Sequence, residues 1–503
     1  MNAQSRKLEL DEIQGNILGG FNKDFQDFLF LKVKNKARAR NWIKEHSQLV
    51  STSSQVLSFN NAFKALKASG VSKPEGIIQA RWLNIAFSAS GLHALGFTKT
   101  QHGAWPRDFS QGMAARAKLT GDTAGADSPS DPKRWSGPFA QDARADVHVL
   151  LLLAADSEED LKAHANTFTA PPAFAAAFTI VGTVEGRTRV DEPGHEHFGF
   201  KDGVSQPGIR GINVPDDPLS NPNQGHPGQD LLWPGEFVLG YPKQIPKADP
   251  RVDGPNPNPG APARAGKPAW TDNGSFLVFR RLEQDVPAFH KQLGDLARKF
   301  GEPVDRMGAK LVGRYRSGCP LAALTMQPAP PPPSPTDPAF LRPELADNDA
   351  LNNAFEFQDN DPNGARVPLA AHIRKAYPRD EALPGVKSED SESNTQTHRL
   401  LRRGIPFGRS FGAEEGGGAS DPRGLLFLAY QKSIESQFEY VQQQLVNQPT
   451  FPVAGAGQDP IISQSPSGPF LCTGQTEPVK HFVKTTGGEY FFVPSLSTLR
   501  DRF

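Results

Sequence analysis

The chain has 503 residues, more than one hydrophobic core usually serves, so we expect two domains. Lys and Arg together number 55, as do Asp and Glu, and the resulting net charge of zero argues against a nucleic-acid or anionic-membrane partner. The two cysteines exclude a disulfide framework and favour a reducing compartment. The chain shows no secretory signal at its start and no run near the roughly 18 apolar residues of a membrane helix. We therefore predict a soluble, cytoplasmic protein.

Strands and helices alternate along the first 190 residues. Apolar runs predict strands at 28–33, 82–88, 146–155 and 178–190. Helical spacing predicts helices at 37–50 and after residue 157, where Ser157 and Asp160 form a capping-box pattern. Ser90 is the expected N-cap of a short helix after the second strand.

The second half repeats this rhythm. Strands are predicted at 274–282, 424–430 and 487–496, and helices at 286–300 and 434–447. This order favours two α+β halves with antiparallel sheets over a doubly wound parallel sheet. No close sequence repeat relates the two halves.

Glycine and proline concentrate in two stretches. The chain has 47 glycines and 46 prolines, many of them in residues 213–268 and 327–338. Such stretches cannot continue a helix or a central strand, so we predict surface loops or a connector there.

Several familiar sites are excluded. The sequence lacks GxxxxGK[ST], HExxH, CxxC and GxSxG patterns, and the glycine run at 413–418 lacks the strand-to-helix context of a phosphate loop. His195 and His197 alternate like residues on one strand face, but no third ligand at a suitable spacing accompanies them. We therefore discount a zinc site.

Three segments remain as candidates for chemistry. Asp202 lies in the turn GFKDG (199–203), where an aspartate either bonds its own backbone or approaches a bound group. His372 lies in the apolar stretch VPLAAHIRK, next to Arg374, and fits either a core histidine or an axial iron ligand. Arg402 and Arg403 precede a Gly-Ile-Pro turn, and an arginine aimed into a pocket stabilises developing negative charge.

Eleven sequence blocks occur along the chain in one characteristic order: DEIQGNIL (11–18), RWLNIAFSASGLHALGF (81–97), QGMAARA (111–117), DVHVLLLLAA (146–155), EHFGFKDGVSQP (196–207), GEFVLGYP (235–242), NGSFLVFRRLEQDV (273–286), AAHIRK (370–375), RRGIPFG (402–408), GLLFLAYQ (424–431) and GGEYFFVPS (487–495). In these blocks and their order the chain resembles the dye-decolorizing peroxidases, a family of haem enzymes, and it looks most like their longer fungal-type branch.

This resemblance implies two ferredoxin-like α+β domains of the dimeric α+β barrel type. The N-terminal domain is expected at 1–212, the connector and loops at 213–268, and the C-terminal domain, which holds most of a haem b, at 269–503.

The same resemblance implies roles for individual residues. Asp202 matches the distal acid/base, Arg402 the distal arginine and His372 the proximal iron ligand, with Arg403 as the competing arginine. The other expected cofactor contacts are Gly203, Arg374, Leu425 and Phe427, and Glu489 is a candidate for the acid that holds the proximal imidazole.

The implied activity is the reduction of hydrogen peroxide coupled to the oxidation of dyes, phenols or other small aromatic substrates. An aspartate is already ionised in mild acid, where a histidine base would be protonated, so it suits the base role, and we expect an acidic optimum for dye oxidation. Large dyes require an electron relay through aromatic residues, for which Tyr377 and Tyr315 are candidates.

Two alternatives stay open, a haem carrier or deferrochelatase-like protein and a cargo peroxidase packaged in a shell. The C-terminal STLRDRF shows no targeting extension, which disfavours the second. A homo-oligomer is compatible with the sequence. The identity of the physiological substrate stays open at this point. The polar segment 384–398, between His372 and Arg402, is longer than we expect for the family and could reshape the distal side.

Overall fold

The computed structural model describes residues 7–72, 74–98, 105–125, 127–219, 223–245, 269–322, 352–359, 361–387, 391–412, 421–464, 467–472 and 475–503. The predicted loop at 327–338, the glycine run at 413–418 and the end of the predicted connector, 246–268, lie outside these residues.

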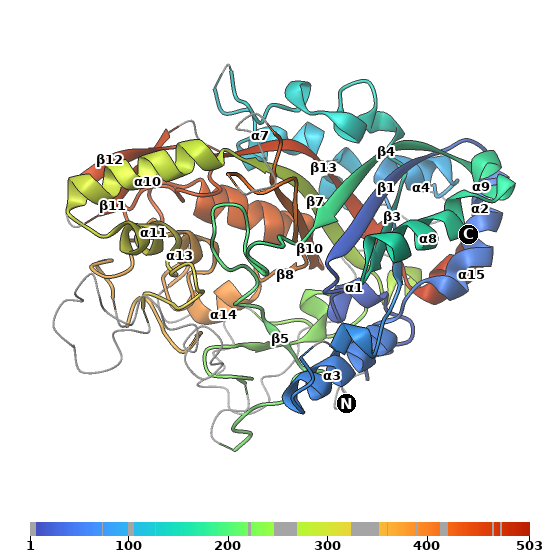
Figure 1. The fold of residues 1–503 in the computed structure, drawn as a ribbon, viewed down its shortest axis with the longest axis horizontal. Coiled ribbons are helices and arrows are strands. Elements are labelled where there is room, and N and C mark those ends of the chain that lie inside the picture. The colour runs from blue at the N-terminus through green and yellow to red at the C-terminus, as the bar shows by residue number, and fades with distance from the viewer. Residues whose placement is uncertain are drawn as a thin grey trace.

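A single nine-stranded sheet runs through the molecule in the order β4-β1-β3-β2-β13-β7-β10-β8, with β9 on β10 (Figure 1). Its strands are β1 (Phe25–Val33), β2 (Trp82–Phe87), β3 (Val149–Ala155), β4 (Phe178–Arg187), β7 (Ser275–Gln284), β8 (Leu401–Arg402), β9 (Ile405–Phe407), β10 (Gly424–Gln431) and β13 (Val483–Val493). Every pairing in this sheet is antiparallel, which confirms the predicted α+β class with antiparallel sheets.

The two halves of the chain contribute adjacent blocks of this sheet. The strands up to residue 190 form one block and the later strands form the other, joined where Phe87 of β2 pairs with Phe492 of β13. In the described part of the chain two small sheets lie outside it, a parallel pair of β5 (Gly208–Ile209) and β6 (Leu231–Leu232) and an antiparallel pair of β11 (Ser467–Cys472) and β12 (Gln475–Lys480).

Helices pack beside each block (Figure 1). In the N-terminal half they are α1 (Gly15–Leu18), α2 (Lys36–His46), α3 (Ser53–Ala68), α4 (Ala89–Ala94), α6 (Arg107–Gln111), α7 (Ala117–Thr120), α8 (Glu158–Thr169) and α9 (Pro172–Ala177). In the C-terminal half they are α10 (Val286–Phe300), α11 (Val304–Val312), α13 (His372–Ala376), α14 (Ser391–Gln396), two π-helical segments η12 (Ile434–Glu439) and η13 (Val441–Val446), and α15 (Leu496–Arg502).

Local hydrogen bonds explain where some helices begin. The Ser157 side chain accepts a bond from the Asp160 N–H, as predicted, and starts α8. The prediction for Ser90 is wrong, because the cap of α4 is Ser88, whose hydroxyl accepts from the Gly91 N–H. The expected helix at 434–447 is present but is wound as successive π-helical turns, a form that is rare and often found at functional sites.

Part of the predicted connector is core rather than surface. Leu232, Tyr241 and residues 237–239 are fully buried and belong to the main hydrophobic cluster. The prolines around them end regular elements, yet their apolar neighbours still pack into the core. The prediction of a surface loop from composition alone is therefore wrong for this part of the segment.

Aromatic side chains from both halves share that core. The ring of Phe279 on β7 lies 5.4 Å from that of Phe28 and 5.2 Å from that of Phe30, both on β1, and 5.7 Å from that of Phe139. The two blocks therefore depend on one another for burial of apolar surface.

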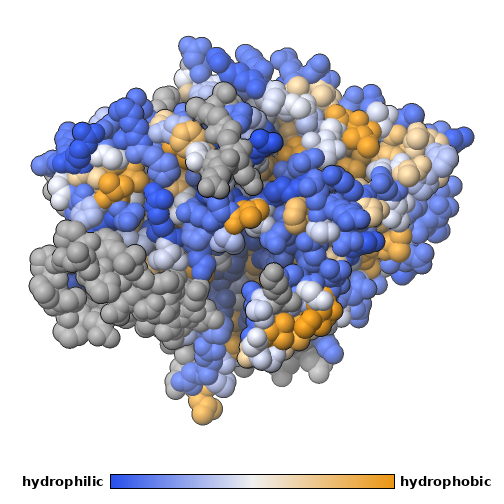
Figure 2. Space-filling model, in the orientation of Figure 1, coloured by the Kyte–Doolittle hydropathy of each residue, from blue (hydrophilic) through white to orange (hydrophobic). Residues whose placement is uncertain are grey.

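The molecular surface is mainly polar on the face shown in Figure 2, where hydrophobic side chains form small separate groups. None of the helices in the described part of the chain combines the length and the apolar character needed to span a membrane.

We expect Phe279→Ala to destabilise the whole molecule. Removing a fully buried ring from the shared core leaves a cavity and costs about 3–5 kcal/mol. Thermal unfolding followed by circular dichroism checks this. Phe411→Ala is the matched control, because Phe411 is 42% exposed and its loss costs little; equal shifts for both variants would contradict the shared core.

Candidate active site

One cavity brings together most of the residues singled out in the sequence. Its wall includes Asp202, Gly203, His372, Arg402, Leu425 and Phe427. Leu425 and Phe427 alternate with Leu426 and Leu428 along β10, so one face of the strand lines the cavity and the other joins the core.

Asp202 and Arg402 form an ion pair across the cavity wall. Their Oδ1 and Nη1 atoms lie 2.9 Å apart, and Arg402 Nη2 donates to the Ser205 carbonyl at 3.0 Å. Gln206 fixes the arginine backbone by accepting from its N–H and donating to its carbonyl. The Asp202 side chain is 35% exposed because it faces the open cavity.

The environment of Asp202 favours its charged form. Burial alone would raise the pKa of this carboxyl, but the positive charge of Arg402 and the N–H of Gly203 outweigh it, so the net pKa lies below the ordinary value of 3.8. Gly203 has φ +76°, a conformation that suits glycine and lets its N–H reach the neighbouring carboxylate.

His372 is held by Asp459 rather than by Glu489. The imidazole Nδ1 lies 2.8 Å from Oδ2 of Asp459, whose side chain is fully buried and whose Oδ1 accepts from the N–H groups of Ile461 and Ile462. The expectation for Glu489 is therefore wrong: its carboxylate instead accepts from the N–H groups of Met113 and Tyr490.

The imidazole of His372 presents its second nitrogen to the cavity. Nε2 has no hydrogen-bond partner among the residues that the structure describes. Burial lowers the pKa of His372, but the charge and the hydrogen bond of Asp459 raise it more. Donation of the Nδ1 proton to a carboxylate leaves Nε2 as a lone-pair donor, the arrangement common in metal-binding histidines.

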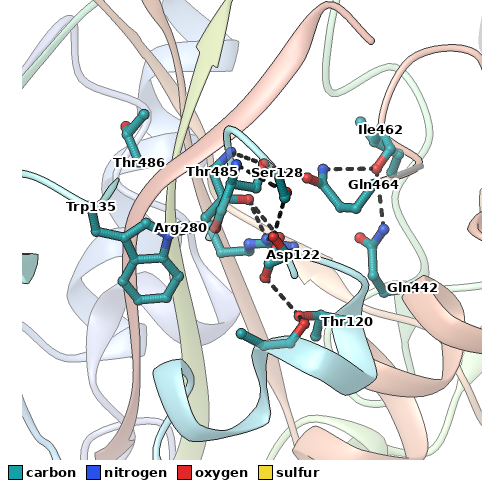
Figure 3. A network of polar contacts seen from close by, with 12 residues as sticks. Thr120, Asp122, Ser128, Trp135, Arg280, Gln442, Ile462, Gln464, Thr485 and Thr486 are labelled. Atoms are coloured by element: carbon teal, nitrogen blue, oxygen red, sulfur yellow. Dashed lines mark hydrogen bonds and ion pairs between the residues drawn. The ribbon is translucent and has the colours of Figure 1, made fainter. Parts of the chain in front are cut away.

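The loop that carries Asp459 is anchored by a buried polar network (Figure 3). Gln464 donates to the Ile462 carbonyl and accepts from Ser130, whose hydroxyl also accepts from the Thr485 N–H. Thr485 in turn shares the carboxylate of Asp122 with Arg280, a cavity-lining residue that is 2% exposed. The network thus connects β7, β13, Asp122 and Ser130 to the support of His372.

Arg374 does not reach the cavity, which corrects its predicted role as a cofactor contact. It is fully buried, and its Nε donates to Glu381 at 2.8 Å while Nη1 donates to the Val367 carbonyl. The neighbouring Lys375 donates to the carbonyls of Gln448 and Phe451. The first turn of α13 directs the His372 side chain toward the cavity and the side chains of Arg374 and Lys375 into the protein interior.

Two other arginines supply positive charge to the cavity wall. Arg314 donates to carbonyl oxygens of Gly318, Asn352 and Asn353, and Arg379 donates to the carbonyls of Gly228 and Asn353. Among the described residues, neither guanidinium has a carboxylate within ion-pair distance. Burial lowers the pKa of Arg314 to about 9, which reflects the cost of an unpaired buried charge.

The remaining candidates take other places. Arg403 donates to the carbonyls of residues 16–18 and is absent from the cavity wall. Tyr315 is 3% exposed and belongs to a small hydrophobic cluster, so it is not a surface residue. Tyr377 lines the cavity, and its hydroxyl donates to Asp230.

His195 and His197 do not form a metal site. His195 contacts backbone carbonyls of Pro193 and Arg316, while His197 is buried against the Phe407 carbonyl, and burial lowers its pKa to about 4. No cluster of metal-binding side chains occurs in the described ranges.

The long polar segment before Arg402 contributes to the cavity. Thr395 and His398 of this segment line it, as does the adjacent Arg399, while Arg402 contacts Asp202. Sequence reasoning also missed Glu196 and Gln284 in the wall. Glu196 lies six residues before Asp202 in the same turn, and Gln284 follows the alternation of Arg280 and Leu282 on β7, so a strand-face reading of 274–284 would have found the latter.

Comparison with known proteins supports this picture. The family model "DyP dimeric alpha+beta barrel domain" matches residues 12–190, and "Dyp-type peroxidase, C-terminal" matches residues 356–451. "Dye-decolorizing peroxidase msp1" of Mycetinis scorodonius is 31% identical, over 99% of this chain and 88% of that protein. "Multifunctional dye peroxidase DyP2" of an Amycolatopsis species is 30% identical, over 98% of this chain and 95% of that protein. The solved structure of an ancestral D-type dye-decolorizing peroxidase matches with a TM-score of 0.77 and 32% identity, over 98% of this chain and 99% of the other.

Arg374→Leu tests the assignment of this arginine to the interior. It leaves the buried Glu381 without its cation, which costs about 3–5 kcal/mol, so we expect a clear loss of thermal stability even in cofactor-free protein. Arg366→Leu serves as control, since Arg366 is an exposed arginine on the same segment. If the variant kept its stability and lost only cofactor binding, Arg374 would be a cofactor contact and its assignment to the interior would be wrong.

Proposed function

Because the chain belongs to the dye-decolorizing peroxidase family and is thus a peroxidase, we propose that it reduces hydrogen peroxide on a bound haem b, with Asp202, Arg402 and His372 in the roles the resemblance implies. The observation that carries the proposal is the cavity in which an ionised Asp202–Arg402 pair and the free Nε2 of His372 both lie.

The cavity residues fit a large planar iron cofactor with carboxylate groups. Apolar side chains such as Leu282, Leu425 and Phe427 line the walls, and Nε2 of His372 is a suitable ligand for iron. Arg314 and Arg379, two buried cations that donate to backbone and amide oxygens, suit the propionates in place of Arg374. When bound, haem supplies the redox-active iron.

Asp202 and Arg402 handle the proton and the charge in peroxide cleavage. With peroxide in the cavity, the Asp202 carboxylate would accept a proton from one peroxide oxygen and return it to the departing oxygen. The permanent charge of Arg402 stabilises the negative charge that develops between the oxygens. Asp459, by holding the Nδ1 proton of His372, increases electron donation from Nε2.

The reducing substrates we propose are small aromatic compounds such as phenols, together with dyes. Two relatives carry names that refer to dyes, which supports this class without naming the natural substrate. A haem carrier is the competing function, and it predicts that His372 matters while Asp202 does not.

We expect His372→Ala to lose the cofactor. Removal of the only proposed iron ligand abolishes retention, so the haem absorption band of the purified protein disappears. His93→Ala, an exposed histidine on α4, keeps the band as control. A variant at position 372 that keeps a wild-type spectrum refutes the ligand assignment, and a wild-type chain that binds no haem refutes the whole proposal.

Asp202→Asn should retain haem and react with peroxide about 10²–10⁴-fold more slowly, because it lacks the base. In the wild type the lowered pKa of Asp202 keeps the base charged in mild acid, so the rate of the peroxide step, as distinct from dye oxidation, should hold from neutral pH into mild acid and decline only when the carboxylate takes up a proton. Stopped-flow absorbance measures both effects, with Asp305→Asn, an exposed acid, as control. Wild-type speed in Asp202→Asn favours the carrier.

A further inference from the structure

Glu196 is a second carboxyl group in the wall of the same cavity. Its Oε1 accepts from the Phe200 N–H and its Oε2 from the Phe198 N–H, both at 2.8 Å, and Gln284 donates to Oε2 from β7. The turn is closed by the bond from the Asp202 N–H to the Gly194 carbonyl and by the pairing of His195 with Lys201. Glu196 and Asp202 are thus held on one rigid turn that faces one cavity.

The two carboxyl groups differ in their charged partners. Asp202 has the guanidinium of Arg402, whereas Glu196 has no cation within ion-pair distance among the described residues. Arg189 approaches from β4's end, but it donates to the Glu196 backbone carbonyl and pairs with Asp191 and Glu192. Burial raises the pKa of Glu196 and the negative charge of Asp202 raises it further. Two acids whose pKa values are pushed apart are the usual basis for a division of proton-transfer roles.

The net reaction of a peroxidase needs protons on the distal side. Reduction of one peroxide follows H2O2 + 2 e⁻ + 2 H⁺ → 2 H2O. Cleavage of the O–O bond uses the protons of peroxide itself, which one carboxylate can move from one oxygen to the other. The two electrons that follow require two further protons, and Asp202, whose charged form is favoured, holds a proton weakly.

We propose that Glu196 is the proton donor that resupplies Asp202 during the electron-uptake stage of turnover. The O–H of the Glu196 carboxyl breaks, its proton passes through cavity water to Asp202 and from there to the oxygen being reduced, and Glu196 regains a proton from solvent. Gln284, whose buried Oε1 has no partner in the described part of the chain, faces the cavity beside it and orients the carboxyl. This inference rests on the proposed function.

Glu196→Gln in the full chain with its cofactor tests the proposal. We expect the reaction with peroxide to stay within about twofold of wild type, because that step imports no proton. Turnover with ferrocyanide, which gives an electron and no proton, should slow by about tenfold. This is less than the roughly 10²–10⁴-fold effect of a lost acid or base, because water replaces the missing donor in part. Oxidation of a phenol, which brings its own proton, should stay within about twofold.

Two variants serve as controls. Glu192→Gln removes a charge from the same segment, outside the cavity wall, and should leave all three rates unchanged. Glu196→Asp keeps a titratable carboxyl and should recover part of the ferrocyanide rate. Equal slowing of the peroxide and ferrocyanide reactions would instead show that Glu196 only maintains the turn, which overturns the proposal.

The pH dependence gives a second readout. A carboxyl with a raised pKa donates while protonated, so wild-type ferrocyanide turnover should decline as pH rises through that pKa, and this limb should vanish in Glu196→Gln. The groups that face Glu196 are Asp202 on the turn, Arg189 after β4 and the uncharged Gln284 on β7. The lowered pKa of Asp202 keeps that carboxylate ionised in mild acid, so the limb belongs to Glu196. Retention of the limb in the variant overturns the assignment.

Infrared spectroscopy separates this inference from the proposed function. A protonated Glu196 contributes a carboxylic-acid C=O band in mild acid that titrates with pH and is missing in Glu196→Gln. The absence of such a band overturns the proton-donor role even if peroxide reacts normally. If Asp202→Asn keeps wild-type speed with peroxide, the proposed function fails instead, whatever the infrared spectra of Glu196 show.

Discussion

The alternation of side chains along β7 and β10 is the constraint on which both the core and the site depend. On β7, Leu277 and Phe279 point into the shared core while Arg280, Leu282 and Gln284 line the cavity. On β10, Leu426 and Leu428 are buried while Leu425 and Phe427 face the cavity. Because the register of a packed strand cannot slip without turning every side chain over, packing of the core fixes the cavity wall as well.

Buried charge is the second constraint, and it explains the polar networks around the cavity. A buried ion is costly unless it is paired or hydrogen-bonded, and Arg280 with Asp122 and Arg374 with Glu381 are buried pairs of this kind, while Arg402 and Asp202 form a half-buried pair in the cavity wall. The first of these pairs also holds Thr485 and, through Ser130 and Gln464, the loop that carries Asp459 (Figure 3). The support of His372 is therefore continuous with the central sheet.

Much of the fold was predictable because its strands are apolar runs of the right length. The segments 146–155 and 274–282 are buried along nearly their whole length, so hydrophobicity alone identified them. The buried apolar part of 213–268 was not predicted as core, because its many prolines made the segment resemble a surface loop. The π-helical winding of 434–447 leaves a pattern close to that of an α-helix, so periodicity could not separate the two.

The residues around the cavity were predictable to different degrees for a physical reason. Asp202, His372 and Arg402 lie in recognisable blocks, whereas their partners are chosen by tertiary structure: Asp459 lies 87 residues from His372, and nothing local distinguishes it from Glu489. Arg374 shows the opposite case: it lies two residues after His372, which lines the cavity, yet its own side chain points away from the cavity. Glu196 and Asp202 share one short turn, yet they differ in environment because Arg402, which arrives from β8, pairs with only one of them. The chemical difference between two acids of one turn is thus created by a strand from the other half of the chain.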